Sequence, residues 1–421
     1  MTEVPVPPGD FPLGSSVTIA ELTEDPHPAL ARLRAAEPVS WLPALGGWLV
    51  TRRDLVEQVL RDPDGFTVDD PRFTTARVVG PSMLSLDGPE HRRHRDPFAR
   101  ALRRGDISAG LAAFTDGAAD RLVAGLSADG GPDGGRPGQA ELRRGLAGPL
   151  AVAVMTQVLG LDDTDPAVLL GWYDAIVAGV NALTAGGAPA DGGSVVSRAG
   201  SAGDGSEVPP AAAAAFGELR TSLEAAIERP GATSLLAAAA GTAGLSVGEV
   251  VSNAAVMLFG GIETTEGMIC NLVWHLLSHP GQAAALDADR TLLDGAVDES
   301  LRLEPAAAVV DRYATADIRL GDAEIRGGDL VVVSLAGANR DPAMFSAPDE
   351  LDLRRPGARQ NLGFALGPHF CVGAQLARME TRAAITALFD RLPALRLDPQ
   401  QPTAPRGLVF RKPPALHVMW D

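Results

Sequence analysis

Cysteine is nearly absent from this chain of 421 residues, which contains only Cys270 and Cys371. Two cysteines cannot build a disulfide framework, and without a Cys-x-x-Cys pair the usual pattern of a structural zinc site is missing. Lysine is scarcer still, because Lys412 is the only one and arginine supplies the other positive side chains. The shortage of cysteine favours a protein of the reducing cytoplasm. The preference for arginine, together with abundant alanine and glycine, indicates a GC-rich bacterial coding bias.

Positive charge is also in short supply, since 36 lysines and arginines face 53 acidic residues and the formal net charge is -17. This balance argues against nucleic acid or an anionic membrane as a partner. The chain has no basic N-terminus followed by an apolar stretch, and no run of about 18 apolar residues that could span a bilayer. We therefore expect a soluble protein.

Two common catalytic patterns are missing as well. The sequence contains no His-Glu-x-x-His and no Gly-x-x-x-x-Gly-Lys. Zinc hydrolases of the first type and nucleotide-binding enzymes of the second therefore have no support. A hydrophobic content of 46% still allows a large core, so the chemistry has to come from other motifs.

The segment from Phe364 to Gly373 places Cys371 in a glycine-rich loop, directly before an expected helix that continues to Phe389. A cysteine at a helix N-terminus faces unpaired N–H groups and the positive end of the helix dipole, and both lower its pKa toward the metal-binding thiolate. Gly367 and Gly373 would let the backbone approach a flat ligand closely. The alternative is a buried structural cysteine without a ligand.

A second unusual segment lies inside a long expected helix that begins near Ser246 and ends at Ser278, before Pro280. Ser246 and Glu249 form a Ser-x-x-Glu capping box. Residues 260–265 read Gly-Gly-Ile-Glu-Thr-Thr, although each glycine costs about 1 kcal/mol in a helix interior. The run is either a tolerated kink, or a place where the glycines and a threonine hydroxyl open the helical hydrogen-bond ladder for a diatomic ligand and water.

The pattern Phe-x-x-Gly-x-x-x-Cys-x-Gly over residues 364–373 resembles the haem-ligand signature of the cytochrome P-450 superfamily. The resemblance implies that Cys371 is the axial thiolate ligand of the iron in haem b. Ala365 stands where a glycine is usual, and we expect little consequence because alanine is the smallest replacement. By position, further haem contacts carry over to Phe364, Gly367 and Gly373.

The resemblance also implies the fold. We expect a mainly α-helical protein with small β-sheets, arranged as the triangular helical prism that this superfamily builds around a buried haem. Residues 1–421 would form a single domain, although the length alone suggests two or three. Residues 186–210 are rich in Gly, Ser, Ala and Pro, and they resemble the flexible lid loop of the family, between helices over residues 166–185 and 211–229.

Few strands can be expected from the sequence. The best candidates are Gly47 to Thr51, Ile318 to Leu320 and Leu330 to Ser334. We also expect residues 408–410 and 415–420 to form a C-terminal hairpin.

The run at residues 260–265 resembles the oxygen-activation motif of the superfamily, Ala/Gly-Gly-x-Asp/Glu-Thr-Thr. The resemblance implies that Gly260 and Gly261 make room beside the haem. Thr264 would then hydrogen-bond dioxygen bound at the iron, and Glu263 would help relay protons to it. These two residues are the expected catalytic pair.

Four cations are expected to bind the two haem propionates, which are carboxylates. Residues 91–95, His-Arg-Arg-His-Arg, resemble the His-x-x-x-Arg helix of the superfamily and assign His91 and Arg95 to this task. Arg312 and His369 stand at two other positions that usually contact propionates. Each cation alone is more simply a solvated surface charge, but together, in the expected order, they favour haem.

Glu299 and Arg302 match the Glu-x-x-Arg motif of the superfamily, a pattern that also occurs at residues 90–93 and 141–144. Only Glu299 lies between the oxygen motif and the cysteine loop. The expected role is structural, a buried ion pair joined by Arg355 that holds the loop carrying Cys371. Leu351 replaces an aromatic residue that is common in the segment leading to Arg355.

Substrate and electron donors are predicted from what the sequence lacks and from position in the family pattern. No flavin or iron-sulfur motif is present, so electrons would come from a ferredoxin and a ferredoxin reductase. An expected dock for an acidic ferredoxin consists of Arg92, Arg93, Arg100, Arg103 and Arg104, for which the alternative is an ordinary solvated helix face. By position, the apolar substrate pocket would be lined by Val79, Met83, Val256, Phe259, Ala308, Val310 and Val409.

Three functions are compatible with these motifs. The first is a monooxygenase that hydroxylates or epoxidises an apolar small molecule, which we expect to be a secondary-metabolite intermediate. The second uses the same haem for oxidative ring closure through a C–N or C–C bond, without inserting oxygen. The third is a haem-binding sensor that does not turn over, although such a protein would not need the pair of Glu263 and Thr264.

Overall fold

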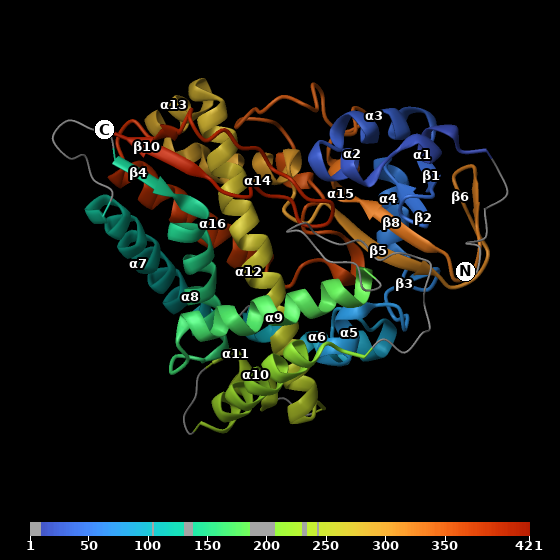
Figure 1. Cartoon of the computed structure of the whole chain (residues 1–421), viewed down its shortest axis with the longest axis horizontal. Helices are drawn as coiled ribbons and strands as arrows, with labels where there is room; N and C mark the ends of the chain where they lie inside the picture. The colour runs from blue at the N-terminus through green and yellow to red at the C-terminus, as the bar shows by residue number, and fades with distance from the viewer. Residues whose placement is uncertain (1–9, 103–104, 130–137, 186–206, 230–233, 242–243) are drawn as a thin grey trace.

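The computed structural model describes residues 10–102, 105–129, 138–185, 207–229, 234–241 and 244–421 (Figure 1). Helices dominate it, and the longer ones are α3 (His27–Ala36), α6 (Gly88–Leu102), α7 (Gly105–Asp129), α8 (Gly148–Leu159), α9 (Pro166–Ala185), α10 (Pro210–Glu228), α12 (Val247–Ser278), α14 (Leu293–Leu303) and α16 (Ala374–Arg391). Shorter helices are α1 (Pro12–Ser16), α2 (Ile19–Glu24), α4 (Arg53–Arg61), α5 (Thr74–Val79), α11 (Leu235–Ala240), α13 (Pro280–Ala288) and α15 (Leu335–Asn339). Single turns are the π-helical η1 (Arg143–Ala147) and the 3-10 turns η2 (Arg290–Leu292), η3 (Ala358–Gln360) and η4 (Gly367–His369).

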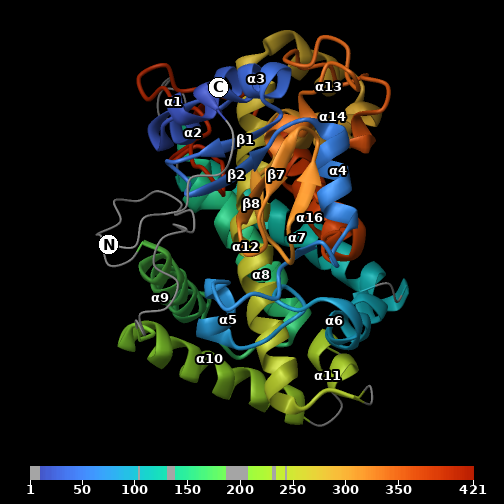
Figure 2. The same ribbon diagram turned by 90° about the vertical axis from the view of Figure 1, so that its right-hand side faces the viewer.

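Helix α12 runs through the centre of the fold. Its 32 residues give it a length of about 48 Å. It begins with the predicted capping box, in which Ser246 and Glu249 bond each other's backbone N–H groups. Helices α8, α14 and α16 pack along it. Figure 2 shows α12 running through the whole molecule, with α9, α10 and α11 around one end.

The strands form three small sheets. The largest has the order β1-β2-β8-β5-β3, and only the pairing of β2 with β8 is parallel. Its strands are β1 (Val39–Leu42), β2 (Gly47–Val50), β3 (Phe66–Thr67), β5 (Val309–Ala314) and β8 (Leu330–Ser334). The second sheet pairs β6 (Ile318–Leu320) with β7 (Ala323–Ile325). In the third, β10 (His417–Trp420) lies between β4 (Gly138–Glu141) and β9 (Arg396–Leu397).

The expected C-terminal hairpin is wrong. Strand β10 pairs with β4, so that Val418 lies opposite Ala140, and with β9 on its other edge. Residues 408–410 are not its partner, since Phe410 makes an isolated bridge to Ala307 instead. The hairpin fails because each strand is short and its partner lies far away in the sequence.

The other expected elements can be compared directly. The strands at residues 318–320 and 330–334 have the predicted bounds, and β2 ends one residue earlier than expected. The helices that flank the predicted lid are α9 and α10, whereas the lid itself lies outside the described residues up to residue 206. No helix among the residues that the structure describes is long and apolar enough to cross a membrane.

Candidate functional site

The loop before α16 presents Cys371 on a tight backbone turn. The N–H of Cys371 donates to the carbonyl of Phe364 at 2.9 Å, and the 3-10 turn η4 lies between them. Gly367 has φ 72° and lies against the carbonyl of Leu60 in α4, where an added Cβ would collide. Glycine at this position is therefore required by the turn and by α4, before any ligand is considered.

A cavity of about 250 Å³ opens at Cys371, whose side chain is exposed. Helix α6 lines it with Arg95, Ala99 and Leu102, α7 contributes Leu111, and the cysteine loop and α16 contribute Phe370, Val372, Leu376 and Met379. The predicted iron ligand therefore faces open space between these helices.

The protein alone does not make Cys371 a thiolate. Desolvation raises the pKa of the thiol, while a hydrogen bond from the Gly373 N–H and the charges of Arg95 and Arg378 oppose the rise. The prediction that the loop by itself lowers this pKa is wrong. A coordinated metal ion would supply the missing stabilisation, because its charge deprotonates a bound thiol.

The four predicted propionate ligands lie within electrostatic range of one another. The rings of His91 and His369 are 4.3 Å apart, and both histidine pKa values are lowered mainly by burial and further by the charge of Arg95. Arg312 is 5% exposed and also acts on His369. The Nη2 of Arg95 donates to the Phe370 carbonyl at 2.5 Å, next to the cysteine.

Sequence reasoning missed Asp87, which organises this group. It accepts hydrogen bonds from the Nε2 of His369 at 2.8 Å, from the Thr67 hydroxyl at 2.7 Å and from the Val68 N–H at 2.8 Å. Against the opposing effect of burial, these donors lower the pKa of Asp87 to about 2. Asp87 therefore fixes the ring of His369, leaving His91 as the less constrained histidine.

The surroundings of the His91 side chain show directly whether these residues fit a haem. Its side chain is 3% exposed, and among the described residues its Nε2 has no hydrogen-bond partner. Burial lowers the pKa of His91 to about 4, so the ring is neutral at pH 7. A buried polar nitrogen without a partner is rare, and a propionate carboxylate is the acceptor that would satisfy it.

Helix α12 has an open face at the first glycine of the oxygen motif. Gly260 is exposed, and an added Cβ would meet no atom within 4 Å. The hydroxyl of Thr264 donates to the Gly260 carbonyl at 2.5 Å. The helix is continuous here, so the room comes from the missing side chain of Gly260 and not from an opened hydrogen-bond ladder.

Gly261 has a different environment. Its α-carbon faces α8, where an added Cβ would collide with the side chain of Met155. This glycine allows the close packing of α8 on α12. The predicted contact of Gly261 with the haem is not needed to explain it.

Glu263 is surrounded by residues that the motif did not reveal. Its Oε1 pairs with Lys412 at 2.8 Å, and its Oε2 accepts a hydrogen bond from the Tyr173 hydroxyl. Lys412 also pairs with Glu266 at 2.6 Å, and Glu266 in turn pairs with Arg143. Only one signal could have pointed here, namely that Lys412 is the single lysine of the chain.

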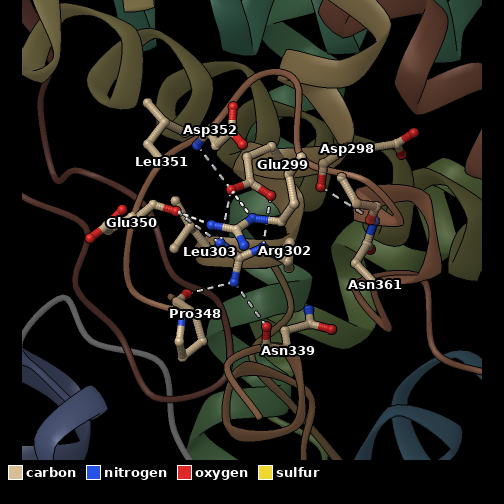
Figure 3. Close-up of polar contacts among 12 residues, drawn as sticks. Asp298, Glu299, Arg302, Leu303, Asn339, Pro348, Glu350, Leu351, Asp352 and Asn361 are labelled. Atoms are coloured by element: carbon tan, nitrogen blue, oxygen red, sulfur yellow. Dashed lines mark hydrogen bonds and ion pairs between the residues drawn. The ribbon is translucent and has the colours of Figure 1, made fainter. Parts of the chain in front are cut away.

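Figure 3 shows the pair of Glu299 and Arg302 and the backbone groups around it. Glu299 and Arg302 have no exposed side-chain surface, and their N–O distance is 2.7 Å. Arg355 donates to Glu299 at 2.8 Å, so the third partner is present despite Leu351 in the preceding segment. Arg302 also donates to the carbonyls of Asn339, Pro348 and Glu350.

The cluster ties α14 to the chain that leads into the cysteine loop. The backbone N–H of Asp352 donates to Glu299, and Asn361 donates to the Asp298 carbonyl (Figure 3). Arg378 of α16 pairs with Asp298 at 2.8 Å and lies over the ring of Phe364. These contacts hold both ends of the loop that carries Cys371.

The predicted pocket residues belong to three apolar clusters. Val79, Met83 and Val256 are buried in the large helical core, with Phe259 packed against it. Val310 packs on one face of the five-stranded sheet, and Ala308 and Val409 lie in the core on the other side. That these residues surround one substrate remains a prediction.

The arginines of the predicted ferredoxin dock differ in their surroundings. Arg92 and Arg100 are exposed on α6. Arg93 pairs with Glu90 at 2.7 Å and with Glu249 at 2.5 Å, which neutralises its charge. Arg103 and Arg104 lie outside the described residues.

Comparison with known proteins identifies the family of the chain. The family model described as Cytochrome P450 matches residues 211–419. The cytochrome P450 monooxygenase PikC of Streptomyces venezuelae is 34% identical over 95% of this chain and 92% of its own length. The mycinamicin VIII C21 methyl hydroxylase of Micromonospora griseorubida is also 34% identical, over 85% of this chain and 86% of its own length.

Solved structures show the same relationship in three dimensions. The crystal structure of CalO2 superposes with a TM-score of 0.81 at 28% sequence identity, covering 94% of this chain and 96% of its own. The chain therefore belongs to the cytochrome P450 family, as a P450 monooxygenase that binds haem b through a cysteine thiolate.

Proposed function

We propose that this P450 hydroxylates or epoxidises an apolar small molecule, an intermediate of secondary metabolism, with dioxygen and two electrons from a separate ferredoxin and ferredoxin reductase. The observation that carries the proposal is the open face of α12, where Gly260 leaves space beside the Thr264 hydroxyl. A reaction that cleaves dioxygen consumes protons, and a hydroxyl next to open space can deliver them.

When bound, haem supplies the oxidising power, because a thiolate ligand favours cleavage of the O–O bond. In the proposed arrangement the sulfur of Cys371 binds the iron, and Phe364 and Gly373 adjoin the ring. The propionates are held by His91, Arg95, Arg312 and His369. The Nε2 of His91 supports this arrangement, because it is buried and lacks an acceptor among the described residues.

Thr264 would bring a proton to the oxygen side of the site. Its hydroxyl is bonded to the Gly260 carbonyl at 2.5 Å, and rotation of the hydroxyl would aim the proton into the open space instead. Replacing Thr264 with alanine should lower the product formed per NADH several-fold and release the difference as peroxide, whereas Thr264→Ser should retain coupling. Unchanged coupling in the alanine variant would point to another proton route.

The substrate class is supported by the relatives and by the chain's apolar residues. One relative is named for methyl hydroxylation of mycinamicin VIII, and another, from Streptomyces fradiae, is a 20-oxo-5-O-mycaminosyltylactone 23-monooxygenase.

Candidate substrates can be found by the change in the Soret band when they displace water from the iron. Turnover under ¹⁸O₂ should then add one ¹⁸O atom to the product. A ring-closed product without ¹⁸O would replace oxygen insertion by C–N or C–C bond formation.

The proposed ferredoxin dock is the outer face of α6, which carries the exposed Arg92 and Arg100. The same helix lines the cavity at Cys371 with Arg95 and Ala99, so a protein bound there would be near the iron ligand. We expect Arg100→Glu to slow ferredoxin-dependent reduction several-fold and to weaken its salt dependence. Arg319→Glu, the same charge change on exposed β6, should leave both unchanged. Equal rates in the two variants would contradict the dock.

A further inference from the structure

Lys412 occupies a place that arginine could not fill in the same way. Its ammonium reaches the Oε1 atoms of both Glu263 and Glu266, at 2.8 and 2.6 Å. These carboxylates are three residues apart on one face of α12, and a compact ammonium can serve both, whereas a planar guanidinium favours one bidentate partner. Lys412 is the only lysine among 36 basic residues, so this chain departs from its arginine preference here.

The group around Glu263 is built from several parts of the fold, while the Glu263 side chain itself is 22% exposed. Tyr173 of α9 donates to Oε2 while its ring packs on Phe259, 5.9 Å between centroids. Arg143 of η1 pairs with Glu266, and its Nη1 donates to the Pro414 carbonyl at 2.8 Å. Other titratable groups that act on members of this network are Glu141, Asp174 and Cys270.

Charge balance inside the network depends on Lys412. Two carboxylates, Glu263 and Glu266, face two cations, Lys412 and Arg143, and the lysine side chain is only 9% exposed. Burial raises the pKa of Glu263, but Lys412, the Tyr173 hydroxyl and Arg143 together lower it below its ordinary value. Without the lysine, two buried carboxylates would share one cation, and protonation would relieve the imbalance.

We infer that Lys412 is a positioning residue of the oxygen site. It holds the side chain of Glu263 in the carboxylate form, bound to Tyr173 of α9 and to the C-terminal segment. This inference rests on the proposed role of Glu263 in proton relay. A proton that reaches Oε1 or Oε2 is then passed on and not retained, because the carboxylate is the form that Lys412 and Tyr173 bind. Lys412 therefore links the acid of the oxygen motif in α12 to the C-terminal segment of the chain.

The first test uses the fact that Lys412 is the only lysine. Incorporation of [ζ-¹⁵N]lysine into the haem-loaded protein places one label in the molecule. We expect its ¹⁵N shift to stay constant between pH 8 and pH 6 and to move in Glu263→Gln. A titration step inside that pH range, or no response to Glu263→Gln, would overturn the inference. This measurement needs neither a substrate nor a folded Lys412 variant.

The second test asks whether the lysine charge controls proton delivery. In Lys412→Met, ferredoxin-driven dioxygen consumption without added substrate should show an acidic limb moved upward by about one pH unit. Lys412→Arg should bring the acidic limb most of the way back to its wild-type position, because it keeps the charge although its guanidinium does not serve both carboxylates equally. A purely structural lysine would lower stability or yield in Lys412→Met and leave the profile in place, which would contradict the inference.

The two proposals can fail separately. Each variant is first examined by the absorption spectrum of its reduced, carbon monoxide-bound form. Absence of a thiolate-type Soret band from the wild type would reject the proposed function itself. Presence of that band in all variants, together with an unmoved pH profile in Lys412→Met, would reject only the role of Lys412.

Discussion

Two polar groups adjoin the cysteine loop, and they differ in how completely the protein satisfies them. In the first, Glu299 and Arg302 have no exposed side-chain surface, and their charges are bound by Arg355 and by backbone groups. In the second, Cys371 is an exposed residue, and the Nε2 of His91 is buried without a partner among the described residues. The first group, whose charges are bound within the protein, suits a structural role. The second group, which has a buried nitrogen without an acceptor, suits the binding of a ligand.

This difference should appear in what each group stabilises. A saturated ion pair contributes to folding, because removing one partner leaves a buried charge. A buried nitrogen without a partner contributes little to folding until the ligand arrives, and then contributes to binding. Substitutions in the two groups should therefore separate unfolding from haem loss.

The largest effect is expected for Glu299→Ala, which leaves the buried Arg302 without its carboxylate. We expect a loss of about 3–5 kcal/mol in the free energy of unfolding, measured by urea titration. Glu324→Gln is the matched control, since its pair with Arg319 is 3.9 Å long and both side chains are well exposed. Equal losses in the two variants would remove the distinction between the groups.

The next effect compares two histidines of α6. His94 is satisfied by Asn253 at 2.9 Å, whereas the Nε2 of His91 has no partner among the described residues. We expect His91→Phe to weaken haem retention about tenfold or more, the value of a hydrogen bond to a charged group. His94→Phe should instead lower the stability of the fold. Haem transfer to apomyoglobin and thermal unfolding measure the two quantities, and the opposite assignment would contradict the comparison.

The smallest effect concerns Ala365 in the cysteine loop. Its φ of 56° is left-handed, so the alanine that we expected to be harmless carries a backbone cost. Ala365→Gly should stabilise the protein by about 1 kcal/mol. Ala377→Gly, in the interior of α16, should destabilise it by about the same amount. Thermal unfolding of both variants checks the opposite signs, and a loss of stability in Ala365→Gly would show that the loop carries no strain.

The sequence predicted what local motifs can encode. The family, the mainly helical fold with small sheets, haem b and the monooxygenase class are confirmed by the comparisons. The capping box at Ser246 appears as expected, because it involves residues only three apart. The individual roles of the site residues remain proposals.

The sequence could not predict contacts made by distant segments. Strand β10 pairs with residues 138–141. A strand of four residues has too few alternating apolar and polar positions to identify such a partner from the sequence. Tyr173 and Lys412 reach Glu263 from 90 and 149 positions away, and no local spacing records that meeting. The pKa of Cys371 was predicted in the wrong direction, because desolvation by the residues that line the cavity outweighs the local hydrogen bond from Gly373.

The most direct measurement of the central claim is the absorption spectrum of the reduced, carbon monoxide-bound protein. With Cys371 as the iron ligand, the wild type should show the Soret band of a haem thiolate, and Cys371→Ser should lose it. Cys270→Ser should keep the band, because Cys270 is fully buried in the helical core. A wild type without this band, or a Cys371→Ser variant that keeps it, would contradict the account.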